Sequence, residues 1–397
     1  MQKAMKYRYF PILAAALAVC GCTPSGCQPS YEAEPTLAVP AQLQSDAFAI
    51  NVFRELAQHH KGNITFSPAS LESMLRLLQQ GARGVTAREL ATLPMGQPDV
   101  RTAMQPTSAN ALFIGENLRL KGDIQADEII PSPLSGNPDV AAKQINNWAC
   151  DKTDGMIPSI MDADTLKQRN TPVRLIAANA LALHEKWLRP FPEENTRPGT
   201  FFREDSSTSM VQMMHQTGHF RYAKGEDWLA VALFYRRDGR PGEPGCFLAI
   251  LPTGSARGFA ATLTADKFSS IRQALAISDP VEFHLGLPVF EQRTPTFSLA
   301  KALQACGLKH IFSQEANLSG FSDEPLFLSD VLQRCYVKAD EQGVKAAAVT
   351  MGVARKQSIP TGPHPVIFDR PFIWAICDLT TPAAPRFLGL YEGLSQP

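Results

Sequence analysis

The order of hydrophobic periodicities along the chain is the feature that most constrains its fold. Helical spacing comes first. In LQSDAFAINVFRELAQHH, Phe48, Val52 and Leu56 recur every four residues and form an apolar stripe on one helix face. The stretch SPASLESMLRLLQQG opens with Ser67 as a helix N-cap followed by a proline, and Gly81 ends it. The first part of the folded chain is therefore predicted to be helical.

Two further stretches extend this helical region, and one helix is expected later. Thr86 and Glu89 have the spacing of a capping box at the start of TARELATL. The stretch NNWACDKTDGMIPSIM is typical of a helix followed by a turn. A helix returns at FSLAKALQACGLKHIF, with Gly307 near its end.

The second half of the chain changes to strand-like patterns. VRLIAANALAL, WLAVALFYRR, CFLAILPTG and VEFHLGLPVFE are apolar runs bounded by glycine, proline and charged residues. The segment PVIFDRPFIWAICDLTTPAAPRFLGLYEG predicts two strands around a proline-rich turn. Because helices come first and strands later, without regular βαβ alternation, the pattern predicts an α+β fold.

The first 44 residues differ from the rest. A basic stretch without acidic residues precedes the short apolar run PILAAALAV, which is typical of a secretory signal peptide and too short for a membrane span. VCGC at 19–22 resembles a bacterial lipobox, so we expect residues 1–21 to be removed and Cys22 to be lipidated; plain secretion is the alternative. Residues 22–44 predict a flexible tether, and 45–397 the folded domain. The expected location is the cell envelope, lipid-anchored at the outer membrane or cell surface.

Composition and motifs exclude several kinds of activity. The chain has 397 residues and zero net charge, which gives no reason to expect nucleic acid as a partner. The cysteines at 150, 246, 306, 335 and 377 lack CxxC spacing, so no zinc site is expected, and the sequence specifies no disulfide. There is no GxSxG, P-loop or dinucleotide-binding pattern, and neither His184 nor the pair His59-His60 has metal-site spacing. We therefore expect no enzyme, cofactor or metal.

The stretch EQGVKAAAVTMGVARKQSIP, residues 341–360, is too small-sided for an ordinary core strand and too poor in charge for an ordinary loop. As a strand from residue 344 onward it would alternate faces. Both charges, Lys345 and Arg355, fall on one face, and the other face is uncharged and mostly small. We interpret it as a loop that can become a strand; an alanine-rich loop or helix end is the alternative. The uncharged face holds Val344, Ala346, Ala348, Thr350, Gly352 and Ala354.

Motifs surrounding this stretch resemble those of the serpins over roughly residues 45–397. NITFSPASLESMLRLLQQGARGVTARELATL, ANALALHEKWLRPF, MVQMM, FLAILP and ANLSGFSDEPLFLSDVLQ follow one another in the family's order. ADEQGVKAAAVT is similar to the hinge of the family's reactive loop, and DRPFIWAI and FLGLYEG to its C-terminal strands. The resemblance implies a serpin fold: about eight or nine helices, three β-sheets and an exposed reactive-centre loop.

The resemblance also implies a function. Serpins are suicide substrates: a serine or cysteine protease cuts the loop, forms an acyl-enzyme, and is trapped when the cut loop inserts as a new strand in a central β-sheet. The fourteen residues from Val344 to Gln357 would span roughly 46 Å at 3.3 Å each. We therefore expect a monomeric protease inhibitor forming covalent complexes, with a non-inhibitory serpin acting as a substrate or binding protein as the alternative.

The resemblance assigns the loop positions as well. The reactive bond falls at Gln357–Ser358 by counting from the hinge glycine, with cleavage after Lys356 or Arg355 as alternatives. The first inserting position is usually Thr or Ser in the family, and here it is Val344. The hinge comprises Glu341, Gly343, Val344, Lys345, Ala346, Ala347, Ala348, Val349 and Thr350.

Other residues match positions beneath the family's central sheet. Ser67, Ser70 and Asn179 correspond to its shutter, and Trp187 to the breach where insertion starts. Gln333 stands where the family usually has a histidine, and an amide can both donate and accept a hydrogen bond. Residues 94–140 are short for the family's fourth helix and lack a basic cluster, so we expect no glycosaminoglycan activation.

Overall fold

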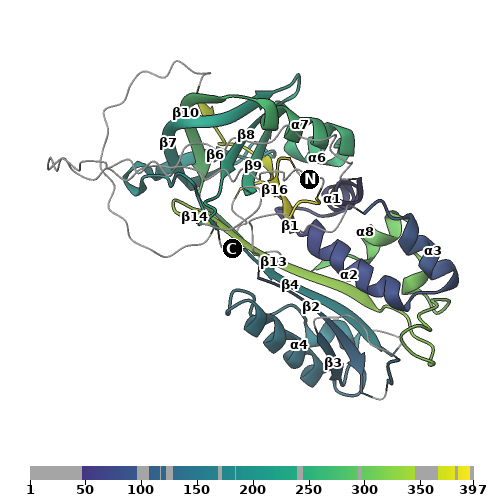
Figure 1. The fold of residues 1–397 in the computed structure, drawn as a ribbon. Coiled ribbons are helices and arrows are strands. Elements are labelled where there is room, and N and C mark those ends of the chain that lie inside the picture. The colour runs from purple at the N-terminus through teal and green to yellow at the C-terminus, as the bar shows by residue number, and fades with distance from the viewer. Residues whose placement is uncertain are drawn as a thin grey trace, which may run out of the picture. The chain divides into compact units, whose positions relative to one another are not determined.

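Eight α-helices and two β-sheets build the part of the chain that the computed structural model describes (Figure 1). This confirms the α+β fold and the expected number of helices. The described residues are 47–95, 107–116, 118–121, 128–168, 172–183, 185–238, 245–293, 297–344, 365–380 and 383–393.

Local sequence signals set the bounds of several helices. Helix α2 is Pro68–Gly81, and the Ser67 hydroxyl caps it by accepting from Ser70 N at 3.2 Å, as the sequence predicts. Helix α8 ends before Gly307, which takes a φ of 101°. The remaining helices are α1 (Ala47–His59), α3 (Gly84–Thr92), α4 (Pro138–Lys152), α5 (Ala163–Lys167), α6 (Ala256–Thr262), α7 (Ala265–Ile277) and α8 (Ala300–Ala305), with 3₁₀ turns η1 (Glu193–Asn195) and η2 (His310–Phe312).

The predicted capping box of helix α3 is wrong. The helix begins at Gly84, so Thr86 lies inside it and its hydroxyl accepts from Asn317 N at 3.0 Å. Glu89 accepts from the backbone N–H groups of Lys309 and His310, both at 2.8 Å. Both side chains therefore bond to backbone groups more than two hundred residues away instead of capping the helix.

The first sheet has nine strands, and β7 explains why one sheet stands where two were expected. The far end of β7 pairs with β8 through residues 221–224, while its earlier part pairs with β6 and β10. This one long strand therefore joins the group of strands around β6 and β10 to the group around β8 and β9 in one hydrogen-bonded sheet. In order, the strands are β1 (Ile64–Phe66), β17 (Phe387–Tyr391), β16 (Phe372–Asp378), β9 (Gly245–Pro252), β8 (Trp228–Phe234), β7 (Thr208–Lys224), β10 (Pro280–Pro288) and β15 (Val366–Ile367), with β6 (Arg197–Phe202) beside β7.

The second sheet has eight strands and lies between two helical layers. Helix α4 covers one face, and α2 lies on the other (Figure 1). Its order is β3 (Glu128–Ser132), β2 (Thr107–Gly115), β4 (Leu175–Ala182), β13 (Asp330–Asp340), β14 (Gly343–Val344) and β5 (Glu185–Lys186), with β11 (Phe290–Arg293) and β12 (Phe297–Ser298) also paired to β13.

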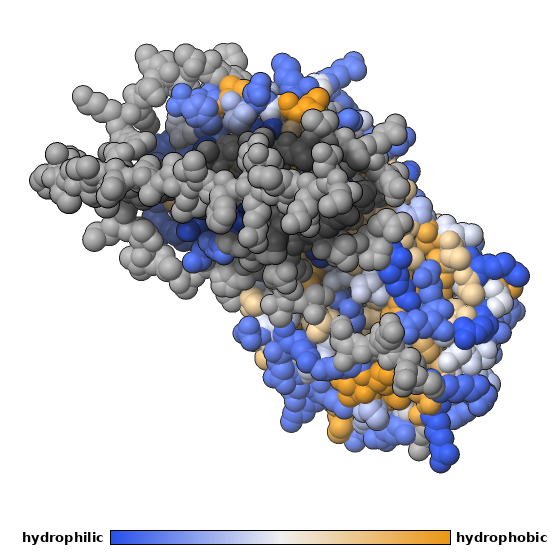
Figure 2. All heavy atoms as spheres, viewed as in Figure 1, coloured by the Kyte–Doolittle hydropathy of each residue, from blue (hydrophilic) through white to orange (hydrophobic). Residues whose placement is uncertain are grey.

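Figure 2 shows hydrophilic residues over most of the described surface on the face in view, with hydrophobic residues in smaller groups. Among the described residues, no helix has the length and apolar character needed to cross a membrane.

Candidate functional site

Strands β4 and β13 lie directly beside each other in the middle of the second sheet. They pair in parallel, from Ile176 opposite Asp330 to Ala182 opposite Tyr336. We call this boundary the β4–β13 seam. Parallel pairing is slightly less stable per residue than antiparallel pairing, so the seam is a weaker joint than the antiparallel boundary between β2 and β4.

The two faces of the seam differ. Val331 of β13 points toward the main core and α2, and Gln333 on the same face reaches Ser67 at the start of α2. Further along that face, Cys335, Val337 and Ala339 pack in a second core cluster with residues of the first sheet. Leu332 and Tyr336 point the other way and pack in a cluster with Ile145 and Trp148 of α4. Helix α4 therefore covers the seam from outside, while polar residues near α2 meet it from inside.

The start of the predicted hinge already forms a strand at the end of the seam. In β14, Gly343 lies opposite both Asp340 of β13 and Lys186 of β5, and both pairings are antiparallel. A Cβ atom added at Gly343 would lie 2.1 Å from the carbonyl oxygen of Glu185. Only glycine leaves room for the chain to enter between β13 and β5 at this point.

Trp187 holds the turn that precedes β14. Its indole Nε1 donates to the carbonyl of Asp340 at 2.8 Å, and its backbone N–H donates to the carbonyl of Gln342 at 3.0 Å. The ring is buried and stacks on Tyr235 with centroids 5.1 Å apart. The structure thus places Trp187, which the resemblance assigns to the breach, against the turn that leads into β14.

Charged and polar groups also fix the hinge. The Glu341 carboxylate accepts from Thr196 Oγ1 at 2.7 Å, and its carbonyl accepts from Phe191 N at 2.8 Å. Lys338 and Asp340 form an ion pair at 3.0 Å, and the hydrogen bond to Asp340 raises the pKa of the Lys338 ammonium. The hinge therefore starts from a defined position.

Gln333 and Asn179 form the polar centre of the seam. They are register partners, and Gln333 Nε2 donates to Asn179 Oδ1 at 3.1 Å. The same amide donates to Ser67 O at 3.1 Å and accepts from Ser67 N at 2.7 Å. All three residues are buried. The hydrogen bonds of the Gln333 amide therefore join β13 and β4 to the start of α2.

Sequence analysis missed the extension of this network. Asn179 Nδ2 donates to Asn110 Oδ1 at 2.9 Å, and Asn110 Nδ2 lies 3.5 Å from Ser73 Oγ. Asn110 lies opposite Asn179 in β2. Polar contacts therefore run from α2 through β13, β4 and β2 and back to α2. The signal available in the sequence was Asn110 itself, the one polar residue in the stretch ANALF at 109–113.

A second buried glutamine lies nearby but outside the seam. Gln292 in β11 accepts from Thr65 Oγ1 at 2.5 Å and donates to Leu390 O at 3.2 Å. It joins the second sheet to β1 and β17, and it is 3% exposed. Because β11 pairs with the other side of β13, this amide can stay in place if the seam opens.

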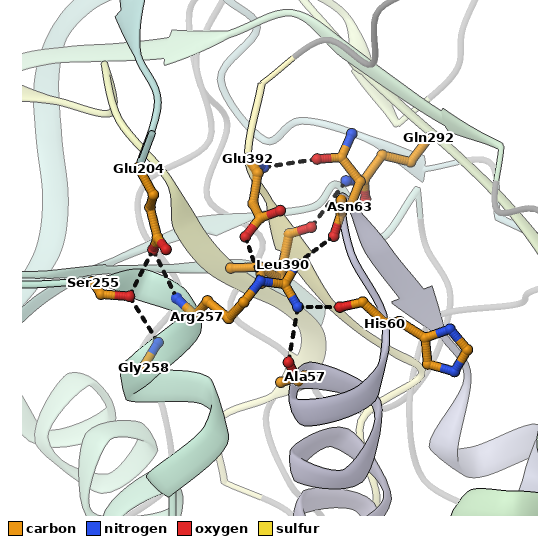
Figure 3. Close-up of polar contacts among 11 residues, drawn as sticks. Ala57, His60, Asn63, Glu204, Ser255, Arg257, Gly258, Gln292, Leu390 and Glu392 are labelled. Atoms are coloured by element: carbon orange, nitrogen blue, oxygen red, sulfur yellow. Dashed lines mark hydrogen bonds and ion pairs between the residues drawn. The ribbon is translucent and has the colours of Figure 1, made fainter. Parts of the chain in front are cut away.

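Arg257 is another structural residue that sequence analysis did not find (Figure 3). Its guanidinium forms an ion pair with Glu392 at 2.8 Å and donates to carbonyls at the end of α1, including Ala57 O at 2.8 Å. A cation suits the carbonyl end of a helix. Glu392 N in turn donates to Asn63 Oδ1 at 2.7 Å, so the end of β17 is tied to the chain after α1.

Several predicted site residues lie outside the described residues. They are Cys22, Lys345, Ala346, Ala347, Ala348, Val349, Thr350, Arg355, Lys356, Gln357 and Ser358.

Comparison with known proteins agrees with this geometry. The family model described as Serpin (serine protease inhibitor) matches residues 43–391. An alpha-1-antitrypsin-like protein of Tamias sibiricus is 29% identical over 374 residues, covering 86% of each chain. An uncharacterized serpin-like protein of Thermococcus kodakarensis is 29% identical over 370 residues, covering 85% of this chain and 82% of its own.

Solved structures share the fold. The thermophilic serpin tengpin in its native state matches with a TM-score of 0.74 at 23% identity, over 89% of this chain and 94% of its own. Uncleaved ovalbumin matches with the same TM-score at 19% identity, over 89% and 99%. With the family model spanning most of the chain, this protein belongs to the serpin family.

Proposed function

We propose that this protein irreversibly inhibits serine proteases, with papain-like cysteine proteases as a second target class. The protease attacks the reactive loop, stays joined to the new carboxyl end as an acyl-enzyme, and moves with that end as the loop inserts into the β4–β13 seam. The observation that carries the proposal is β14, which already occupies a strand position between β13 and β5.

The register of β14 supports insertion into this particular seam. Val344 lies opposite Ala339 of β13 and Glu185 of β5. Six residues further along each antiparallel ladder, Thr350 would face Gln333 on one side and Asn179 on the other. These two are already each other's partners across the seam. Two separate ladders therefore predict the same inserted strand, with Thr350 between the two amides.

The same register assigns the faces of the inserted strand. Cross-strand partners point to the same side of a sheet, and Gln333 and Asn179 point toward α2. Thr350, Ala348 and Ala346 would share that inner side. The other face, with Lys345, would point toward α4. The small uncharged face would thus enter the core, and the charges would stay outside.

The energetics favour the inserted form. An inserted strand would replace one parallel pairing with two antiparallel ones and bury its small apolar face. The uncut loop is tethered at both ends, beyond Val344 and before β15, and this tether opposes full insertion. The native form is then a kinetic trap that one peptide-bond cleavage releases.

We also propose an exported monomer, anchored by lipid on Cys22 to the bacterial cell envelope. In that position it would guard the cell against host, predator or its own proteases. Cell fractionation tests the anchor: Cys22→Ala should move the protein from the membrane fraction to the soluble fraction. A membrane-bound variant would contradict this part of the proposal without touching inhibition.

The central test is incubation with trypsin, elastase, subtilisin and papain, followed by a denaturing gel. Inhibition predicts a protease–serpin band that survives denaturation. The cut protein should also melt at a much higher temperature than the uncut one. Cleavage by all four proteases without any stable complex would refute the proposal and support a non-inhibitory substrate or binding protein.

A further inference from the structure

Two cysteines lie directly opposite each other in the centre of the first sheet. Cys246 in β9 and Cys377 in β16 are register partners in an antiparallel pair. Both are buried, and both belong to the same core cluster, so their side chains leave the sheet on the same face. The two thiols are therefore neighbours across the paired strands.

We propose that Cys246 and Cys377 form a disulfide in the exported protein. Opposed residues in antiparallel strands have Cα atoms about 4.5–5.5 Å apart. Disulfides span Cα separations of roughly 4.4–6.8 Å. The pair can therefore close by side-chain rotation, without moving the strands. An oxidising compartment outside the cytoplasm supplies the conditions in which such bonds persist.

The bond forms by thiol–disulfide exchange with a donor disulfide of another protein or small thiol. One cysteine thiolate attacks a donor sulfur, giving a mixed disulfide and releasing one donor thiolate. The second cysteine then attacks the mixed disulfide and releases the other donor sulfur. The two cysteines lose two protons and two electrons, and the donor leaves as two thiols.

Burial sets the time at which this exchange takes place. In the folded protein, burial raises the pKa of the Cys246 thiol well above its usual value, and the hydrogen bond with Cys377 raises it further. A thiol in this state is a poor nucleophile and is shielded from a donor. The exchange therefore takes place while the chain folds, before β16 pairs with β9. The finished bond is buried and is thereby protected from reductants.

The other cysteines of the described chain offer no competing pair. Cys335 lies opposite Leu181 in the seam, Cys150 belongs to α4, and Cys306 follows α8. In the described strands, Cys246 and Cys377 alone face each other as register partners.

The bond would change the outcome of loop cleavage. The segment between Cys246 and Cys377 contains the whole reactive loop between β14 and β15. After a cut there, the two pieces would stay covalently joined, and denaturation alone would not separate them. The bond itself does not depend on protease inhibition. Only this consequence of cleavage rests on the proposed function of the loop.

The deciding experiment maps the cysteines of the full chain, exported behind an unrelated signal replacing residues 1–21. The protein is alkylated in denaturant without reductant, digested and analysed by mass spectrometry. We expect one linked peptide pair carrying Cys246 and Cys377, which disappears when reductant precedes alkylation. Recovery of both residues as alkylated thiols, or linked to other cysteines, would overturn the proposal.

A second readout does not require any target protease. A recognition sequence for a specific protease replaces residues 355–360, and the cut protein is run on a denaturing gel. Without reductant the pieces should migrate together; with reductant they should separate. Cys377→Ala should separate without reductant, whereas Cys306→Ala, the control, should behave like the parent. Separation of the parent without reductant would contradict the bond.

Discussion

Gln333 Nε2 donates to Asn179 Oδ1 at 3.1 Å across the β4–β13 seam. Within the described part of the second sheet, this seam is the strand boundary that the reactive loop would have to open. The same side chain forms two more hydrogen bonds with the backbone of Ser67. One amide thus holds both edges of the joint and the helix beneath it.

Gln333→Leu should make the protein convert to an inactive, inserted form on its own. The change leaves Ser67 N and Asn179 without this partner, which costs about 1–3 kcal/mol of unfolding free energy. Gln292→Leu is the matched control, because it removes a buried amide outside the seam. Urea unfolding should show similar losses for both. Inhibitory activity after mild heating should fall faster only for Gln333→Leu; equal rates would assign no special role to the seam.

Gly343→Ala should shift the proposed inhibition toward substrate behaviour. The added Cβ would collide with the carbonyl oxygen of Glu185, so β14 could not keep its place between β13 and β5. The number of serpin molecules consumed per protease trapped should rise severalfold. Gly136→Ala is the control, since nothing lies within 4 Å of a Cβ there. An unchanged stoichiometry in Gly343→Ala would show that β14 is not the start of insertion.

Charge on the two faces of the loop should have opposite consequences. Ala348→Lys would place an ammonium group on the face that enters the core, where an unpaired charge is costly. Ala347→Lys puts the same group one residue away, on the face that already carries Lys345. Only Ala348→Lys should lose covalent complex on denaturing gels while still being cut. Loss in both variants, or in neither, would contradict the register drawn from β14.

Cleavage should start a new chain at Ser358. N-terminal sequencing of the smaller fragment, separated from the rest of the cleaved chain in denaturant with reductant, identifies the bond directly. A new end at Gln357 or Lys356 would instead place the cut after Lys356 or Arg355 and point to trypsin-like targets. A cut outside residues 355–358 would contradict the counted position.

Stability should fall as the pH drops below about 6.5, the ordinary pKa of histidine. His215 and His284 hydrogen-bond at 3.1 Å on β7 and β10, and burial, followed by the nearby charge of Arg197, lowers both pKa values. The unfolded chain therefore takes up protons first, and stability present above 6.5 is lost as the pH falls through the lower folded pKa. Melting temperatures from pH 8 to pH 5 should decline less steeply in His284→Gln. Equal slopes would show that this pair does not carry the effect.

Local signals in the sequence predicted local structure well. Ser67, Pro68 and Gly81 mark the ends of α2 because caps act within a few residues. The capping box at Thr86 failed because distant backbone groups compete for the same side chains. Strand β7 was not predicted, because its burial does not alternate regularly: Met213 and Met214 are both buried, as are Phe220 and Arg221.

The candidate site was likewise predicted only in part from the sequence. Family motifs pointed to Ser67, Asn179, Gln333 and Trp187, and the structure brings the first three together and places Trp187 at the hinge. The partner of the Gln333 amide could not be read from the sequence, because its contacts cross between strands far apart in the chain. Asn110 went unnoticed for the same reason.

The strand order of the first sheet has a consequence for biosynthesis. Strand β1 is translated at residue 64, yet its partner β17 arrives only at residue 387, and β16 and β17 stand between β1 and β9. A nascent chain on the ribosome therefore cannot complete this sheet until nearly all of it has been made. This delay suits the export proposed above, because a polypeptide must pass a secretion channel unfolded.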